Sequence, residues 1–201
     1  MAARPRRTTL SKALRLACWN AGGVRGRKQE LDHFLGKYEI GICLLTETHL
    51  RSSIVFRMAN YVGHRNDRLT EGGGTAKLVR RDIGHHAVSF KGLEHLEATA
   101  IQVMMANKPV IILAAYLSPS RPLNALELSA CLDDGLPVLI AGNLNAKHVE
   151  WNSRLIMKRG RLFGDYADKN LCLIHGPNTP TTVPYNPYSA RIEDEIRLQT
   201  G

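Results

Sequence analysis

Four apolar segments of the sequence each end in a polar side chain that can take part in phosphate or metal chemistry. The segments are LRLACW, IGICLLT, VIILAA and PVLIAG, and the residues that follow them are Asn20, Glu47, Tyr116 and Asn143, with Asn145 two residues further on. Turns favour Asn for ordinary reasons, so any one of these residues is weak evidence. The set is more informative, because polar groups beyond the ends of core strands converge on a cleft in sheets flanked by helices.

These residue types suit a hard cation and a phosphate group. One carboxylate with neighbouring amides is a poor acid–base pair. Mg²⁺, however, prefers oxygen ligands, keeps several waters and is often held by one or two carboxylates plus substrate phosphate. Such an ion polarises a phosphoryl oxygen and stabilises the leaving oxygen. Asn and Tyr hold a phosphate without adding charge, so the pattern indicates metal-assisted chemistry on a phosphate.

The elements that must position these residues are mainly short strands, several of them adjacent without an intervening helix. Strands are predicted at 14–19, 40–46, 61–65, 75–79, 86–90, 98–105, 110–117, 137–141 and 171–175. Helices are predicted at 27–37, 123–132 and 161–169, and the chain beyond Pro177 is turn-like. This order favours a mixed sheet, or two packed sheets with helices outside, over a doubly wound parallel sheet.

The charge of the chain, +9, is unevenly distributed and points to a polyanion as partner. Eight basic residues precede the first acidic residue, Glu30: Arg4, Arg6, Arg7, Lys12, Arg15, Arg25, Arg27 and Lys28. A second basic group consists of Lys77, Arg80 and Arg81, and a third of Lys158, Arg159 and Arg161. Each phosphate that such groups neutralise releases counterions. Many soluble domains are basic without binding nucleic acid, so charge alone favours DNA only slightly.

Composition and cysteine spacing bound the class of protein. The chain suits one domain with a substantial core, and no apolar run approaches the roughly 20 residues that span a bilayer. Cys18, Cys43, Cys131 and Cys172 are far apart without zinc-site spacing, so they indicate reduced thiols, mostly in the core of an intracellular protein. Residues 1–15 are similar to a transit peptide, but the run is short and hardly amphipathic, which favours a disordered basic arm at residues 1–13.

Five segments occur in the order CWNAGGVRGRKQEL, ICLLTETHL, HRNDRLTEGGGTAKLVRR, AAYLSPSRP and AGNLNAKHVEWNSR. In this order they resemble the endonuclease domain of non-LTR retrotransposons, which belongs to the endonuclease/exonuclease/phosphatase superfamily alongside apurinic-site endonucleases. The resemblance covers about Leu14 to Pro187. It implies a four-layer α/β-sandwich, dependence on Mg²⁺ (with Mn²⁺ as a substitute), and hydrolysis of one DNA strand. The product 3′-hydroxyl primes reverse transcription, which places the protein in the nucleus.

The resemblance also implies roles for individual residues. Glu47 corresponds to the principal metal ligand, assisted by Asn20, and Tyr116 to a residue that holds the phosphate in the transition state. Asn145 corresponds to the residue that binds the scissile phosphate and orients the nucleophile. His148 belongs to the retrotransposon version of the same motif. The residues expected to contact DNA-backbone phosphates are Asn20, Arg25, Arg121 and Lys147.

The first departure from the family is at Asn143. The family motif is Gly-Asp-x-Asn, whose aspartate helps position or activate the attacking water. Here the motif is Gly142-Asn143-Leu144-Asn145. An amide keeps much of the shape of a carboxylate but cannot accept a proton at neutral pH, and losing a charged transition-state group can remove orders of magnitude in rate.

The second departure is at the end of the chain. The family continues past a Tyr-Asn-Pro segment through a strand containing Asp to a Ser-Asp-His motif, whose His is the general base. Here residues 188–201 read YSARIEDEIRLQTG, a divergent tail that fits neither element, and no Ser-Asp-His occurs. The domain at 14–187 is therefore expected to lack its last strands. An uncovered sheet edge would favour self-association.

Three interpretations stay open on the sequence alone. The chain is an active Mg²⁺-dependent DNA nickase, an inactive DNA-binding remnant of a retrotransposon, or a captured fragment with a structural role. His49, His148 and His175 are the histidines nearest in sequence that could replace the missing base, and such a replacement has to lie within about 3 Å of the attacking water.

Overall fold

The computed structural model describes residues 13–69, 72–132, 135–176 and the backbone of 196–200. In chain order its elements are β1 (Leu16–Asn20), η1 (Arg25–Arg27), α1 (Lys28–Lys37), β2 (Ile42–Thr46), β3 (Tyr61–Asn66), β4 (Thr75–Arg80), β5 (His85–Val88), β6 (Leu96–Met105), β7 (Lys108–Leu117), α2 (Ala125–Leu132), β8 (Val138–Asn143), η2 (Val149–Trp151), α3 (Lys158–Lys169), β9 (Cys172–His175) and β10 (Ile196–Thr200). The predicted strands and helices are present with small shifts of their ends, whereas β10 and the two 3₁₀ turns were not predicted. The expected basic arm lies outside the described residues, apart from residue 13.

The strands form two mixed sheets. The four-stranded sheet has the order β1-β2-β4-β3, and the six-stranded sheet has the order β5-β6-β7-β8-β10-β9. Two neighbouring pairs are parallel, β1 with β2 and β7 with β8, and the other pairs are antiparallel. The two parallel pairs matter for function, because each brings the carboxyl ends of two strands to the same edge of its sheet.

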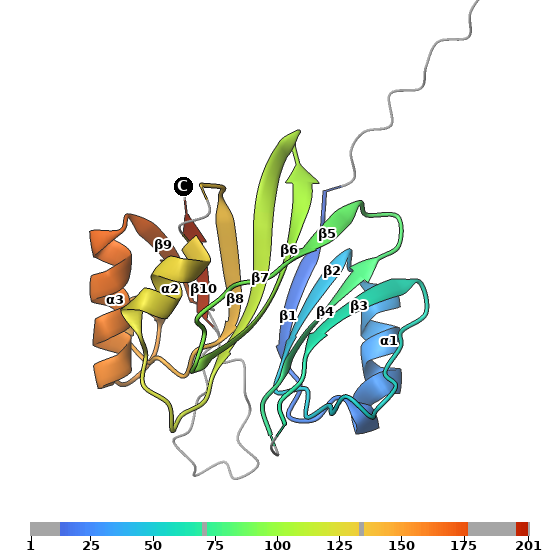
Figure 1. Cartoon of the computed structure of the whole chain (residues 1–201), viewed down its shortest axis with the longest axis horizontal. Helices are drawn as coiled ribbons and strands as arrows, with labels where there is room; N and C mark the ends of the chain where they lie inside the picture. The colour runs from blue at the N-terminus through green and yellow to red at the C-terminus, as the bar shows by residue number, and fades with distance from the viewer. Residues whose placement is uncertain (1–12, 70–71, 133–134, 177–195, 201) are drawn as a thin grey trace, which may run out of the picture.

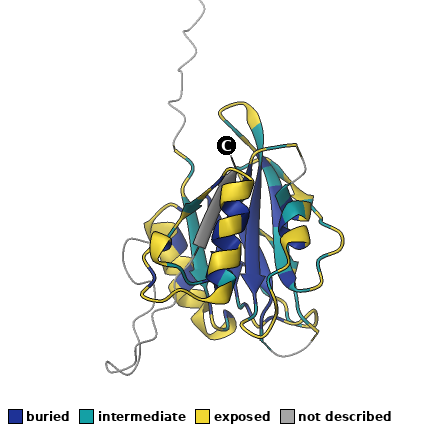
Figure 2. Ribbon diagram, turned by 90° about the vertical axis from the view of Figure 1, so that its left-hand side faces the viewer, coloured by how far each residue is buried: buried dark blue, intermediate teal, exposed yellow. Residues whose placement is uncertain are grey.

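The sheets pack face to face, and the helices cover their outer faces (Figure 1). Buried side chains of α1 pack on the four-stranded sheet, those of α2 and α3 pack on the six-stranded sheet, and a third cluster fills the space between the sheets. Figure 2 shows the helices exposed on their outward side and the strands behind them buried. The predicted four-layer α/β-sandwich is thus confirmed.

The tail corrects one expectation from the sequence. Residues 188–201 were expected to be a divergent tail outside the domain, yet β10 lies between β8 and β9 and is antiparallel to both. The sequence of β10, IRLQT, alternates apolar and polar residues, which is the period of a strand. The acidic residues before it obscured this short signal. The six-stranded sheet therefore continues beyond the predicted boundary at residue 187.

Other predictions from composition can be compared with the structure. The four cysteines all lie within the described residues, three of them buried, and form no disulfide. Burial raises the pKa of the Cys131 thiol to about 12, which favours the neutral thiol expected of a core residue. Among the described residues, no helix combines the length and the apolar composition needed to cross a bilayer.

Gly142 is required because the backbone of β8 passes close to that of β7 at this position. Its φ is +156°, and a Cβ at this position would lie 1.9 Å from the carbonyl oxygen of Ala115 on β7. We therefore expect Gly142→Ala to lower the free energy of unfolding by about 3 kcal/mol or more, because a backbone collision cannot be relieved by a side-chain rotation. Urea denaturation measures this loss. Gly84→Ala is the control, since a Cβ there meets nothing within 4 Å. Equal urea midpoints for Gly142→Ala and Gly84→Ala would contradict the conclusion that glycine is required at position 142.

Candidate active site at the carboxyl ends of four strands

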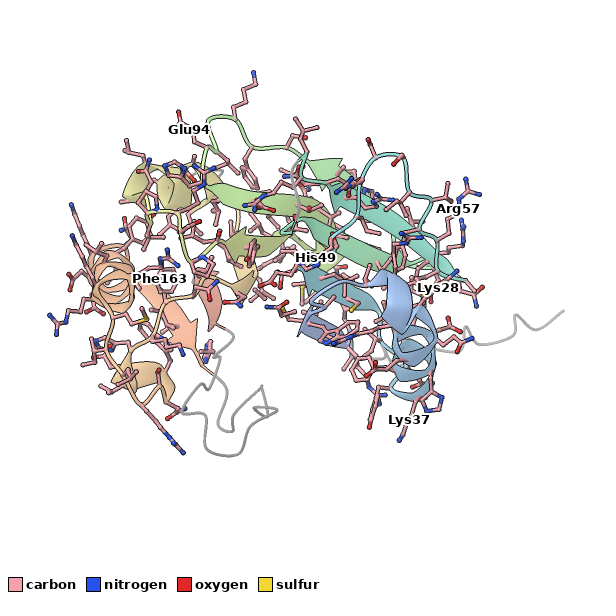
Figure 3. The ribbon with its side chains drawn as sticks, turned by 90° about the horizontal axis from the view of Figure 1, so that it is seen from below. Lys28, Lys37, His49, Arg57, Glu94 and Phe163 are labelled. Carbon is pink, nitrogen blue, oxygen red and sulfur yellow. The ribbon has the colours of Figure 1, made fainter. Side chains whose placement is uncertain are left out.

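The residues singled out by the sequence pattern lie at one edge of the sandwich. Asn20 ends β1 opposite Thr46, the last residue of β2, and Glu47 follows directly. Tyr116 on β7 is the register partner of Asn143 at the end of β8. These strand ends form the lower edge of the molecule in Figure 1, and Figure 3 looks onto that edge with His49 near its middle. The predicted convergence of the four strand ends is therefore present.

Glu47 is the charged centre of this cluster. Asn20 Nδ2 donates to Glu47 Oε1 at 2.9 Å, and Tyr116, from the other sheet, also forms a side-chain hydrogen bond with Glu47. The backbone of Glu47 has a φ of +49°, a left-handed conformation that is uncommon for a residue with a side chain. Such strain persists only where the surrounding structure holds it, and it is frequent at functional sites. The two contacts join the sheets through one partly exposed carboxylate.

Tyr116 is a neutral donor rather than a base. Its side chain is buried, with 6% of the residue exposed. Burial, together with the nearby Glu47 carboxylate, raises the pKa of Tyr116 to about 12. The phenol therefore keeps its proton throughout the neutral range. It can donate a hydrogen bond to a carboxylate or a phosphate oxygen, but it cannot take a proton from water.

Asn143 and Asn145 build the turn that follows β8. The backbone N–H of Asn145 donates to Asn143 Oδ1 at 2.9 Å, and Asn145 Nδ2 donates to the carbonyl of Leu117 at 2.9 Å. Asn145 has a φ of +49°, whereas Asn143 is 4% exposed. The amide of Asn143 thus shapes the turn, and the amide of Asn145 ties that turn to the end of β7.

Comparison with known proteins establishes what kind of domain this is. The sequence pattern of one protein family, the Endonuclease/Exonuclease/phosphatase family, matches residues 17–193. The chain belongs to this family. It is 26% identical over 181 residues to the RNA-directed DNA polymerase from mobile element jockey of Drosophila funebris. It is 24% identical over 176 residues to the probable RNA-directed DNA polymerase from transposon X-element of Drosophila melanogaster. These matches cover 87% and 86% of this chain, but 19% of each relative.

Solved structures of the Endonuclease/Exonuclease/phosphatase fold superpose over nearly the whole chain. The endonuclease domain of TRAS1, a telomere-specific non-LTR retrotransposon, matches with a TM-score of 0.73 and 13% identity, covering 93% of this chain and 85% of that one. An AP endonuclease from Archaeoglobus fulgidus matches with a TM-score of 0.61 and 15% identity, covering 92% and 86%. At such low identities the likeness shows the shared fold.

Nucleases of the Endonuclease/Exonuclease/phosphatase family generally use divalent metal ions, and the residues present here fit one kind of metal site. Glu47 is a carboxylate whose donors Asn20 and Tyr116 are both neutral, so neither offsets its charge. The part of the chain that the structure describes holds no group of three or more His, Cys, Asp or Glu side chains placed to bind a metal. A zinc site would need such a group, whereas Mg²⁺ can be held by one carboxylate with water and phosphate.

Two of the histidines named from the sequence, His49 and His148, lie in different surroundings. His49 Nε2 lies 3.9 Å from Glu47 Oε2, so this imidazole adjoins the carboxylate. His148, which was predicted to be catalytic, accepts from the backbone N–H of Glu150 through Nδ1, and its ring packs 4.9 Å from that of Trp151. His148 thus begins a 3₁₀ turn. Its catalytic role stays a prediction.

The predicted DNA-contacting residues lie at the strand ends or in the segments that directly follow them along the chain. Arg25 is exposed on η1, and Arg121 is exposed in the β7–α2 loop (residues 118–124). Lys147 is half-buried in the β8–η2 loop (residues 144–148). It lines, together with Asn145, a groove of about 770 Å³. The structure corrects one member of the second basic group: Lys77 is fully buried between the sheets and cannot contact a polyanion.

One polar residue near the site, Glu97, was missed. Glu97 on β6 is the register partner of Tyr116, accepts from the backbone N–H of Gly74 at 2.5 Å and forms an ion pair with Arg68. Glu97 opens no motif and follows no apolar run, so only the pairing of β6 with β7 brings it beside Tyr116. The glycines at 72–74 were the sequence signal that pointed to this part of the site, because glycine favours turns. Their positive φ values fit a turn that presents backbone N–H groups.

Proposed function

We propose that this chain is the endonuclease domain of a non-LTR retrotransposon protein that nicks one strand of DNA with the help of a divalent cation. The observation that carries the proposal is the junction of the two sheets at Glu47, where Asn20 and Tyr116 both bind the same carboxylate. A lone carboxylate with neutral donors suits a phosphodiester with Mg²⁺ better than it suits acid–base chemistry on a neutral substrate.

Each residue of the site would have its own role in cleaving the phosphodiester. Glu47, assisted by the Asn20 amide, would hold the cation, which when bound polarises the scissile phosphate and stabilises the leaving oxygen. Tyr116, kept neutral by burial, would donate to a phosphate oxygen as negative charge develops. Asn145 lines the groove and is held by its bond to Leu117, so its amide would orient the same phosphate. Arg25, Arg121 and Lys147 would contact flanking phosphates.

We further propose that nicking is slow in this chain. Asn143 supplies an amide where the family's motif has aspartate, so it would add no negative charge to help hold a cation and would accept no proton from water. His49 is the described histidine nearest Glu47, and an imidazole at this position could take over part of the role of a base. The substrate would be chromosomal DNA, which places the domain in the nucleus, and the 3′-hydroxyl of the nick would prime reverse transcription.

The experiment that tests the proposal is nicking of supercoiled plasmid by purified protein with Mg²⁺, with Mn²⁺ or with EDTA, beside Glu47→Ala. We expect slow nicking that requires the cation and falls about 100-fold or more in Glu47→Ala, because the variant loses the principal metal ligand. Glu39→Ala is a matched control, since it removes an exposed carboxylate whose ion-pair partner, Arg15, also lies outside the site.

The opposite result has a definite meaning. Equal cleavage by the wild-type and Glu47→Ala proteins, with both folded, would assign the cleavage to a contaminant. It would leave the second candidate function, a catalytically inactive DNA-binding remnant. The neutral, 4% exposed Asn143 favours this second candidate. A fluorescence anisotropy titration with duplex DNA at several salt concentrations separates it from a structural role, because phosphate contacts make affinity fall steeply with salt.

We also propose that the protein self-associates through an edge strand of the four-stranded sheet. Among the described strands, β1 has β2 as its sheet neighbour and stands at the end of the four-stranded sheet. The expected result is a sedimentation coefficient that rises with protein concentration. A monomer at all concentrations would refute the proposal.

A further inference from the structure

Arg159, on the first turn of α3, ties together the two loops that carry the site residues. The loops leave the ends of β7 and β8, and the Arg159 guanidinium donates to backbone carbonyls in both. Nη1 donates to Leu144 and Asn145, each at 3.3 Å, and Nη2 donates to Ser118 and Pro119, each at 3.1 Å, and to Arg121. Loop segments separated by more than twenty residues in the sequence thus share one side chain.

The partners of Arg159 are all carbonyl groups. No described carboxylate lies within ion-pair distance of Arg159, so its positive charge is held by the dipoles of backbone groups. Both terminal nitrogens are already engaged by carbonyls from the two loops. Arg159 therefore has little capacity left for a phosphate, and it differs in this respect from exposed basic residues such as Arg161 on the same helix.

The start of α3 is itself fixed against the β8–η2 loop. The backbone N–H of Met157 donates to the carbonyl of Lys147 at 3.0 Å. Next to it, Gly160 allows the helix to approach so closely that a Cβ would lie 1.9 Å from the same carbonyl oxygen. Arg159 stands between these two anchors. The helix therefore fixes the position of the guanidinium, and the guanidinium in turn fixes the two loops.

We propose that Arg159 is a positioning residue that fixes the β7–α2 and β8–η2 loops relative to each other and thereby places Asn145 and Arg121 for one phosphate backbone. The inference rests on the proposed function for the ligand, a DNA phosphodiester, but its structural part concerns the protein alone. Among the five donors of arginine, two nitrogens form a planar fork that reaches both loops at once. A lysine ammonium keeps the charge but is a single point with three donors, so Arg159→Lys separates holding the loops from carrying charge.

The first measurement is amide hydrogen exchange of Arg159→Lys without DNA, beside Arg161→Lys as a control with the same chemical change at an exposed position. The reporters are the N–H of Arg121, bonded to Ser118 O at 3.0 Å, and the N–H of Asn145. We expect both amides to exchange about tenfold faster or more in Arg159→Lys, because several charge-assisted hydrogen bonds are lost. The N–H of Ile111, bonded to Pro137 O inside the six-stranded sheet, should be unchanged.

The second measurement distinguishes a positioning residue from a DNA contact. In Arg159→Lys we expect the slope of log affinity for duplex DNA against log salt to stay unchanged, whereas Lys147→Met reduces its magnitude by about 1. With supercoiled plasmid, kcat should fall about 100-fold while KM changes little, since misplacing a group by about 1 Å acts on the chemical step. A purely structural role would lower the melting temperature and leave kcat unchanged at temperatures where the protein is folded.

Several outcomes would overturn the proposal. Unchanged exchange at Arg121 and Asn145 would show that Arg159 does not hold the loops. A salt slope reduced in Arg159→Lys as in Lys147→Met would make Arg159 a phosphate contact instead. Failure of the proposed function would look different: no Mg²⁺-dependent nicking by the wild-type protein, with the exchange difference between Arg159→Lys and Arg161→Lys still present.

Discussion

Asn143→Asp is expected to raise the rate of Mg²⁺-dependent nicking by about 100-fold, the size of effect that one preorganised charged group has on a transition state. The two side chains have nearly the same shape, and Asn143 Oδ1 already accepts from the backbone N–H of Asn145 at 2.9 Å, a bond that a carboxylate oxygen can keep. Asn143 is the register partner of Tyr116, so the new charge would lie at the end of β8, close to Tyr116. It would strengthen the binding of a cation and help to orient the attacking water.

The control for this variant is Asn124→Asp. Asn124 is exposed and its Oδ1 accepts from the backbone N–H of Leu126 at the start of α2, a capping role that aspartate fills equally well. The substitution adds the same charge away from the strand ends and should leave nicking unchanged. If Asn143→Asp nicks no faster than Asn124→Asp, although it binds Mg²⁺ more tightly, the missing general base and not the amide limits the reaction.

Lys77→Met is expected to raise the free energy of unfolding by roughly 1 to 4 kcal/mol, as replacement of buried ionic groups by apolar ones often does. Lys77 is fully buried, and its Nζ donates to the carbonyls of Thr99 and, at 3.0 Å, of Ile112 on the opposite sheet. Neither partner carries a full negative charge, so the ammonium is poorly compensated. Methionine has a similar length without the charge, and it adds to the apolar cluster between the sheets.

The same residue predicts how stability depends on pH. Burial lowers the pKa of Lys77 well below its ordinary value of 10.5. A lowered pKa means that the unfolded chain binds the proton more tightly than the folded protein. The contribution of Lys77 to stability is thus present above pH 10.5 and is lost as the pH falls through the folded-state pKa. Between pH 10.5 and the lower folded-state pKa of Lys77, the wild-type protein should lose stability relative to Lys77→Met as the pH is lowered.

Urea denaturation of both proteins at a series of pH values measures this difference. Lys169→Met serves as the control, because Lys169 is exposed at the end of α3 and its loss should change stability by less than about 0.5 kcal/mol at every pH. A Lys77→Met protein that is less stable than the wild type at neutral pH would show that the two carbonyl contacts outweigh the desolvation of the ammonium.

The candidate site was predictable from the sequence in its members but not in its contacts. Asn20, Glu47, Tyr116 and Asn143 were recognisable because each directly follows an apolar run, and strand periodicity is a local property of the chain. That Tyr116 binds Glu47 was not legible, since the two residues belong to different sheets and meet only when the sheets pack. The contacts of His148 with Glu150 and Trp151 were likewise not legible in the motif, and its catalytic role stays a prediction.

The basic residues show the same limit. Lys77, Arg159 and Arg161 all counted equally toward a positive surface in the sequence. In the structure Lys77 lies between the sheets, Arg159 holds two loops by their carbonyls and Arg161 is exposed. Net charge is a sum over the chain, and it carries no information on which ammonium or guanidinium group reaches the surface.

Local sequence patterns were enough to predict the order of the strands and helices and the strand ends at which polar groups gather, because hydrophobic periodicity and turn residues act over a few neighbouring positions. The four-layer sandwich was expected from the family resemblance that the ordered motifs carry. The sequence patterns did not predict that Glu97 lies beside Tyr116, that β10 enters the six-stranded sheet or that one guanidinium joins the loops after β7 and β8. The physical reason is that these contacts join residues distant along the chain. Their geometry depends on strand register and on the packing of two sheets, which no local pattern specifies.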